Sequence, residues 1–189
     1  MANHMETYVR ITNGDINVAK KLKEIFTPDE GKYEVWTTEL IKRIYDDVPN
    51  DDDDIDYAWC ISNLGAKWMH SDFEYDDDCS CIHLMLTSAW SVPQQFLEQL
   101  AKVLHTIKED CYISGNYEDE GFNPIGAYIY AKGYDDIEDL DVEVDFDKIW
   151  DDDEYRDDIY NQNHKLHDDM IGWYNDHLKD IEENPEDYI

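Results

Sequence analysis

The stretch from Cys81 to Ile107 constrains the fold most, because a strand pattern in it runs directly into a helix pattern. Its first part alternates three apolar residues with three others, which is typical of a strand with one buried face: Ile82, Leu84 and Leu86 against His83, Met85 and Thr87. Six apolar residues then recur at helical spacing: Phe96, Leu97, Leu100, Val103, Leu104 and Ile107. Ser91 and Gln94 predict a capping box at the start of this helix. We expect Trp90 to fill the corner between strand and helix.

Strand and helix patterns alternate along the rest of the chain, which predicts an α+β fold. Two helix patterns, each with one apolar face, lie at residues 18–26 and 40–45. Strand patterns occupy residues 8–12, 57–64, 111–117 and 126–131. We expect the last two strands to pair as a hairpin, and the helices to pack on one face of an antiparallel sheet.

The last third of the chain differs in composition. Four apolar residues alternate with four acidic ones from Leu140 to Asp147, which predicts a strand with one apolar and one fully acidic face. A helix follows, and five residues are expected to form its buried stripe: Ile159, Leu166, Met170, Trp173 and Ile181. We therefore predict one domain, with a core at residues 1–132 and an acidic strand-and-helix extension at residues 133–189 packed on it.

Charge is the strongest functional clue in the sequence. The chain has 47 acidic and 15 basic residues, a formal net charge of -32. A small domain needs a net charge of only about 2–8 for solubility, and a larger one destabilises the compact state through self-repulsion. We infer that the excess has a use. The same charge argues against direct contact with DNA phosphates or an anionic membrane.

Three sources of this acidity compete: adaptation to high salt, calcium binding, and a surface that competes with nucleic acid for a basic protein. The basic residues are 12 Lys and 3 Arg, and large aromatic residues are plentiful, which argues against salt adaptation. We find no signal peptide and no apolar span of about 18 residues. Together with four cysteines in or beside apolar runs, this predicts a cytoplasmic chain with reduced, buried thiols.

Four short segments carry a resemblance to a known family. In chain order they are residues 1–4 (MANH), 63–68 (NLGAKW), 87–93 (TSAWSVP) and 117–122 (YEDEGF). The chain from residue 1 to about 132 resembles the ferredoxin-like domain of Api92-like proteins from phages and plasmids. It departs from the family pattern at four positions, where that pattern has Trp, Thr, no residue and Pro: Leu64, Ala66, Ser88 and Val92. The resemblance implies a ferredoxin-like α+β fold and a mobile-element origin, with no established activity and no catalytic residues.

The candidate partner-binding site consists of carboxylates in two acidic stretches. Residues 135–158 contain 14 acidic residues against Lys148 and Arg156. Alternate residues of a strand stand about 6.6–6.8 Å apart, so their carboxylates can match alternate backbone phosphates, although one strand face cannot copy a duplex alone. The competing interpretation is a solvated acidic face. The candidate residues are Asp135, Asp136, Glu138, Asp139, Asp141, Glu143, Asp145, Asp147, Asp151, Asp152, Asp153, Glu154, Asp157 and Asp158, with Asp51, Asp52, Asp53 and Asp54.

Metal sites are weaker candidates. The runs Asp51–Asp54 and Asp151–Glu154 lack the glycine and the spacing of an EF-hand calcium loop. Two groups offer transition-metal ligands but lack the second half of a zinc motif: His164, His167 and His177 with Asp168, and Cys79 with Cys81. We therefore expect no metal site and no cofactor.

An enzyme and an aromatic interface are the remaining site classes. Three acidic residues beside His83 or Tyr117 can be drawn as an acid–base site, but nothing in the sequence fixes their geometry: Glu118, Asp119 and Glu120. Four aromatic residues interleave with the acids and are either packed inside or anchors for a partner: Trp150, Tyr155, Tyr160 and Tyr174. We expect no enzymatic activity.

The sequence therefore predicts a non-enzymatic, acidic, phage-type inhibitor or DNA mimic that acts in the host cytoplasm. Its expected partner is a basic host protein that binds nucleic acid, of the restriction, CRISPR, nuclease or polymerase type. The chain itself is expected to be a monomer or homodimer that contacts neither nucleic acid nor membrane. Two alternatives stay open: a small-ligand or regulatory module built on the sheet, and a dimerising structural protein that uses the last helix.

Overall fold

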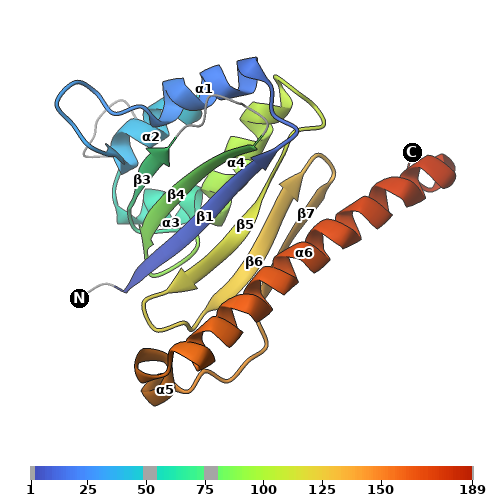
Figure 1. Cartoon of the computed structure of the whole chain (residues 1–189). Coiled ribbons are helices and arrows are strands. Elements are labelled where there is room, and N and C mark those ends of the chain that lie inside the picture. The colour runs from blue at the N-terminus through green and yellow to red at the C-terminus, as the bar shows by residue number, and fades with distance from the viewer. Residues whose placement is uncertain (1–2, 49–54, 75–80, 189) are drawn as a thin grey trace.

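A seven-stranded antiparallel sheet forms the centre of the protein (Figure 1). The computed structural model describes residues 3–48, 55–74 and 81–188. The strands are β1 (His4–Thr12), β2 (Val35–Trp36), β3 (Met69–Glu74), β4 (Cys81–Ala89), β5 (Tyr112–Asp119), β6 (Ile125–Ala131) and β7 (Tyr134–Asp139). Their order across the sheet is β2-β3-β4-β1-β5-β6-β7. The predicted α+β class with an antiparallel sheet is confirmed.

The helices cover both faces of this sheet. They are α1 (Ile16–Phe26), α2 (Thr37–Ile44), α3 (Tyr57–Leu64), α4 (Gln94–His105), α5 (Phe146–Asp151) and α6 (Asp153–Glu183), followed by a 3-10 turn, η2 (Pro185–Tyr188). Helices α1 to α4 lie on one face, whereas α6 crosses the other face over β5 and β6 (Figure 1). The predicted packing on one face holds for α1 to α4, and α6, which the sequence assigns to the C-terminal extension, covers the other face.

The strand β6 shows why a second layer forms. Its tyrosines Tyr128 and Tyr130 join the core beneath α1 to α4, while the residues between them contact α6: Ala127, Ile129 and Ala131. A strand that is apolar at both odd and even positions is typical of burial on both faces. The run GAYIYA at 126–131 therefore requires a cover on each side, and α6 supplies the second one.

The main core confirms the strand and helix patterns that the sequence shows most clearly. Helix α1 begins where the Asp15 side chain accepts hydrogen bonds from the backbone N–H of Asn17 and Val18, at 2.8 and 3.0 Å. The apolar residues of β4 and α4 pack together in one cluster: Ile82, Leu84, Leu86, Phe96, Leu97, Leu100 and Leu104. Burial of this shared apolar surface is the main force that holds α4 against the sheet.

The turn between β4 and α4 differs from its prediction. Trp90 has a positive φ of 71° and is 49% exposed, so it does not fill the corner, and the Lys67 ammonium lies 4.8 Å from its ring centroid. The Ser91 hydroxyl donates to the carbonyl of Gly65 at 2.5 Å instead of capping the helix. Pro93 occupies the N-cap position, so the expected capping box is absent.

Residues 57–64, predicted as a strand, form the helix α3. The Asp56 side chain caps its start by accepting from the backbone N–H of Trp59 at 2.9 Å. Gly65 ends it with a φ of 83°, in the left-handed region that glycine adopts most easily. These two capping residues decide the conformation of an apolar run that is too short to show a period.

The predicted strand from Leu140 to Asp147 is also wrong. The paired acidic strand is β7, which ends at Asp139, and residues 140–145 run on without a ladder until the Asp145 side chain caps α5. The alternation still predicts which side chains turn inward, because Leu140, Val142 and Val144 pack against a small core cluster. The division of the chain at residue 132 stays a prediction.

Helix α6 buries part of the stripe that its apolar residues predict, since Ile159 and Met170 are buried and Leu166 is half-buried. The buried positions are Ile159, Asn163, His167, Met170 and Tyr174, which recur every three or four residues. Trp173 is 46% exposed. Two polar residues, Asn163 and His167, therefore face the sheet in the middle of the helix.

Candidate functional site

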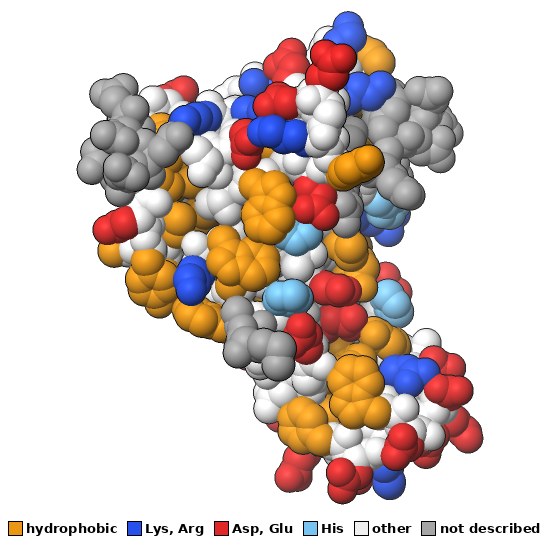
Figure 2. Space-filling view, turned by 90° about the vertical axis from the view of Figure 1, so that its left-hand side faces the viewer, with side chains coloured by type: hydrophobic (Ala, Val, Ile, Leu, Met, Phe, Trp, Pro, Cys, Tyr) orange, Lys and Arg blue, Asp and Glu red, His pale blue; other side chains and the backbone are white. Residues whose placement is uncertain are grey.

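The acidic residues of 135–158 gather on one end and one edge of the molecule. Four lie on the edge strand β7, and the others follow along residues 141–145, α5 and the first two turns of α6. Thirteen of the fourteen are exposed, and Asp136 is half-buried. Figure 2 shows acidic side chains spread over the lower lobe, which is the α5 end of the molecule. Asp51 to Asp54, the other predicted site residues, lie outside the described residues.

Some of these carboxylates have a structural role. Asp145 caps α5, and Asp152 caps α6 by accepting from the backbone N–H of Tyr155 at 3.1 Å. Asp139 accepts a hydrogen bond from the buried Tyr117 hydroxyl at 2.6 Å. Asp153 pairs with Arg156. The remaining acids of this stretch are better candidates for contact with a partner.

Carboxylates also crowd together at the start of α6. Asp153 and Asp157, and likewise Glu154 and Asp158, stand four residues apart on the same side of the helix, about 6 Å along its axis. Such like-charge pairs destabilise a helix by about 0.2–0.5 kcal/mol each. Attraction to the helix dipole offsets this repulsion for acids in the first turn of the helix. The attraction falls off beyond the first turn, so it does not stabilise Asp157 and Asp158.

Aromatic side chains lie beside these acids. On α5, Phe146 is 52% and Trp150 is 60% exposed. Tyr155 and Tyr160 are half-buried, and Tyr174 is buried against Tyr112. Of the four aromatic residues that the sequence marks as anchors, Trp150 is the one that the fold exposes most.

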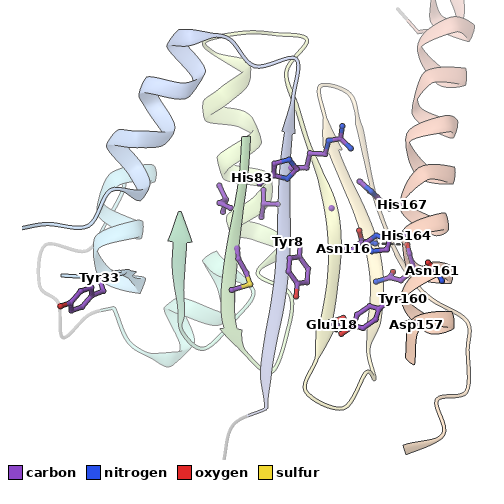
Figure 3. A pocket seen from close by; sticks show the side chains of 16 residues that line it. Tyr8, Tyr33, His83, Asn116, Glu118, Asp157, Tyr160, Asn161, His164 and His167 are labelled. Atoms are coloured by element: carbon purple, nitrogen blue, oxygen red, sulfur yellow. Dashed lines mark hydrogen bonds between the residues drawn. The ribbon is translucent and has the colours of Figure 1, made fainter. Parts of the chain in front are cut away.

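A groove that the sequence analysis missed lies on the second face of the sheet (Figure 3). Helix α6 covers β5 and β6 but leaves β1 and β4 open, so the helix forms one wall and the open strands form the floor. The groove has a volume of about 1190 Å³. Its floor carries Tyr8, Arg10, His83 and Met85, and its wall carries Tyr160, Asn161, His164 and His167. Tyr33, which is 95% exposed, also lines it.

One end of this groove is acidic. Glu118 of β5 is 9% exposed, and its carboxylate accepts a hydrogen bond from the Tyr160 hydroxyl at 3.2 Å. The pKa of Glu118 is raised to about 7, mainly by burial and also by the nearby charges of Glu6 and Asp119, although the hydrogen bond from Tyr160 lowers it. The Tyr8 hydroxyl donates to Glu6 at 3.0 Å. Burial raises the pKa of Tyr8 as well.

The middle of the groove contains buried polar atoms. The Asn116 amide of β5 donates to the backbone carbonyl of Asn163 at 2.9 Å. Asn163 and His167 are 3% and 7% exposed, and the Asn163 Oδ1 and His167 Nε2 atoms have no hydrogen-bond partner in the described part of the chain. Burial lowers the pKa of His167, and the nearby positive charge of Arg10 acts in the same direction, whereas Asp168 opposes it.

The proposed acid–base group at residues 118–120 is not assembled. Glu118 faces the groove, whereas Asp119 accepts from the backbone N–H of Gly121 and Asn123 in the following turn. Glu120 pairs with His4 at 3.3 Å on the far side of that turn. Neighbouring residues of a strand point to opposite faces, which separates Glu118 from Asp119, and β5 ends at Asp119, so Glu120 lies in the turn that follows.

Cysteines and possible metal ligands are also separated. Cys60 and Cys111 are buried free thiols, as predicted, and burial raises the pKa of Cys111 to about 12. Cys79 lies outside the described residues, and the side chain of Cys81 is not described. Within residues 3–48, 55–74 and 81–188, no three His, Cys, Asp or Glu side chains are grouped so that they can hold a metal ion.

Comparisons of the chain with protein-family models, with curated proteins and with solved structures gave no match. In the described parts of the chain, no helix combines the length and the apolar character that crossing a membrane requires.

Proposed function

We propose that this protein is a non-enzymatic acidic inhibitor that binds a basic, nucleic-acid-binding protein through its C-terminal acidic surface. The surface consists of the exposed carboxylates of β7, residues 141–145, α5 and the start of α6. The observation that carries the proposal is their near-complete exposure: thirteen of fourteen carboxylates point to solvent, with Lys148 and Arg156 as the cations of the same stretch.

Competition with nucleic acid is the proposed mechanism. A basic groove binds nucleic acid because its Lys and Arg residues neutralise phosphates and release counterions. Carboxylates held on packed elements offer the same cations charge-assisted hydrogen bonds, which for Arg are often bidentate. Neighbouring acids such as Glu154 and Asp158 repel each other in the free protein, and a cationic partner relieves that repulsion.

The origin and fold family belong to the same proposal. The order β3-β4-β1-β5, with α1 after β1 and α4 after β4, supports a ferredoxin-like βαββαβ core. Together with the segments at 63–68 and 87–93, this supports membership of the Api92-like proteins of phages and plasmids. A phage protein of this kind acts in the host cytoplasm, on a restriction, CRISPR, nuclease or polymerase protein.

The test is capture from a bacterial lysate on the immobilised protein, with stepwise elution by salt and with duplex DNA as competitor. The informative variant reverses three exposed carboxylates that cap no helix: Asp141→Lys, Glu143→Lys and Glu154→Lys. We expect the native chain to capture a basic nucleic-acid-binding protein that salt and DNA displace, and the triple variant to lose it.

A matched control makes the same charge change at the opposite end of the molecule: Glu30→Lys, Asp46→Lys and Asp47→Lys, all exposed. The proposal is contradicted if the C-terminal triple variant still captures the partner. It is also contradicted if the control variant loses the partner to the same extent. Salt-insensitive capture of a neutral protein contradicts it as well, because charge would then not be the basis of recognition.

A further inference from the structure

Basic groups gather in the groove of an otherwise strongly acidic protein. Arg10 of β1 and His83 of β4 are direct cross-strand partners on the open face of the sheet. His164 and His167 line the same groove from α6, opposite these strands (Figure 3). Three of the seven histidines of the chain therefore line the same groove as Arg10. An anionic group is the ligand chemistry that such a cluster recognises.

Two buried polar atoms give a second, independent indication of a ligand. Asn163 Oδ1 and His167 Nε2 lack partners although both residues are more than nine-tenths buried, and both residues line the groove. A buried polar atom without a hydrogen bond is unfavourable, so native proteins rarely retain one unless it has a use. A polar group that enters the groove can supply the missing hydrogen bonds.

A tyrosine and a methionine lie side by side on the floor next to the basic cluster. Tyr8 of β1 is 43% exposed, and Met85 is its cross-strand partner on β4. Tyr160 lines the opposite wall. An exposed tyrosine ring beside a methionine is a suitable platform for a planar ring, because aromatic faces and thioethers both stack on such rings.

We propose that the groove binds a small anion that carries a planar ring, with the ring against Tyr8 and Met85 and the anionic group at Arg10 and His83. Tyr8 and Arg10 stand two residues apart on one strand face, about 6.6–6.8 Å, so one small molecule reaches both. The unpartnered Asn163 and His167 atoms contact the polar edge of the ring. Asp157, at the far end of the groove, is the residue that this site shares with the acidic surface, and the proposal is independent of the function proposed for that surface.

The opposite end of the groove favours a discrete molecule over a nucleic-acid strand. Glu118 and Asp157 line that end, so a strand that continued through the groove would bring a phosphate against carboxylates. A small anion stops short of them. The more distant carboxylates of the protein affect it little at physiological salt, because charges are screened over about 8 Å.

The test is isothermal titration calorimetry on the full chain at 0.15 M NaCl. The probes are the four nucleoside monophosphates, 4-hydroxybenzoate as an aromatic carboxylate, and inorganic phosphate. We expect at least one ring-bearing anion to bind about tenfold or more tightly than inorganic phosphate. The two kinds of ring-bearing probe distinguish a nucleotide from an aromatic acid as the source of this chemistry.

Two variants separate the two halves of the site. Arg10→Gln should weaken ring-bearing anions and inorganic phosphate alike, by about tenfold. Tyr8→Leu should weaken the ring-bearing anions by about tenfold, since stacking on an aromatic side chain contributes on that scale, and leave inorganic phosphate unchanged. Lys20→Gln is the control, because it removes one positive charge from an exposed position on α1. If Arg10→Gln fails to fold by circular dichroism, His164→Ala tests the same end from the exposed side of α6.

Three results would overturn the proposal. One is that no ring-bearing anion binds more tightly than inorganic phosphate. Another is that Tyr8→Leu and Arg10→Gln change affinity no more than Lys20→Gln. The third is that oligonucleotides bind more tightly as they lengthen, which would make the groove a nucleic-acid surface. The Lys reversals at Asp141, Glu143 and Glu154 should leave binding in the groove unchanged, so this site and the acidic surface can fail independently.

Discussion

The Tyr160 hydroxyl of α6 donates a hydrogen bond to the Glu118 carboxylate of β5 across 3.2 Å, which links the second helical layer to the sheet through a buried acid. Burial raises the pKa of Glu118 from 4.5 to about 7. Between these two values the folded chain holds a proton that the unfolded chain has released. This group therefore favours folding less as pH rises through that window, and its full cost is present above pH 7.

Glu118→Gln should remove this pH dependence. One pKa unit corresponds to about 1.4 kcal/mol, and partial hydration of the carboxylate reduces the effect, so we expect the variant to gain ~1–2 kcal/mol of unfolding free energy at pH 8. At pH 4.5 the gain should vanish. Urea unfolding at the two pH values measures it, with Glu138→Gln on the exposed face of β7 as control. A gain that is equal at both pH values would show that titration of Glu118 is not its cause.

Two glycines should respond in opposite ways to alanine. A Cβ on Gly65 would lie 2.2 Å from the Gln95 side chain and 3.0 Å from the Gln94 backbone nitrogen, at a φ of 83°. We expect Gly65→Ala to reduce the unfolding free energy by ~2–3 kcal/mol. A Cβ on Gly172 of α6 meets nothing within 4 Å, so Gly172→Ala should add ~0.5–1 kcal/mol through helix propensity. Thermal unfolding of both variants checks the contrast, and a loss of stability in Gly172→Ala would contradict it.

The anchor of α6 on the sheet is Met170. It is fully buried in a cluster with Ala127 and Ile129, so Met170→Ala should reduce the unfolding free energy by ~2–4 kcal/mol. Trp173, which apolar periodicity also marks as buried, is 46% exposed. We therefore expect Trp173→Ala to change the unfolding free energy by less than ~1 kcal/mol. Denaturant unfolding ranks the two. The reverse ranking would mean that α6 packs through the side that carries Trp173 rather than the side that carries Met170.

Adjacent aspartates at the α5–α6 junction should differ in their effect on stability. Asp152→Ala removes the cap of α6 and should reduce the unfolding free energy by ~1 kcal/mol. Asp151→Ala removes the same charge from an exposed position at the end of α5, and should leave stability unchanged or slightly higher, because it lessens self-repulsion. Equal losses in the two variants would indicate that charge, rather than capping, governs this junction.

Local signals in the sequence predicted much of the main sheet and its helices. The alternation in β4, the apolar faces of α1 and α4 and the hairpin of β5 and β6 are each visible within about ten residues. The prediction of secondary structure failed where an apolar run was too short to show a period, as at residues 57–64. There the capping residues Asp56 and Gly65 decided the conformation.

The two candidate sites differ in how far the sequence predicts them. The acidic surface follows from composition, and the structure adds which carboxylates have other roles, such as Asp145 and Asp152. The groove depends on residues far apart in the chain, since Arg10 and His167 line the same groove only because α6 crosses the sheet. The spacing of His164 and His167 marks His167 as a possible metal ligand, but no local pattern indicates that it is buried beside Asn163.

The acidic edge strand also affects how copies of this protein associate with one another. Strand β7 ends the sheet on one side, and an uncovered edge offers unpaired backbone groups to a strand of another chain. Asp135, Glu138 and Asp139 are exposed along it, so a second copy that approached edge to edge would bring like charges together. The opposite edge is β2, which is only two residues long. A short edge on one side and a charged edge on the other let an open sheet reach high concentration without growing into fibres.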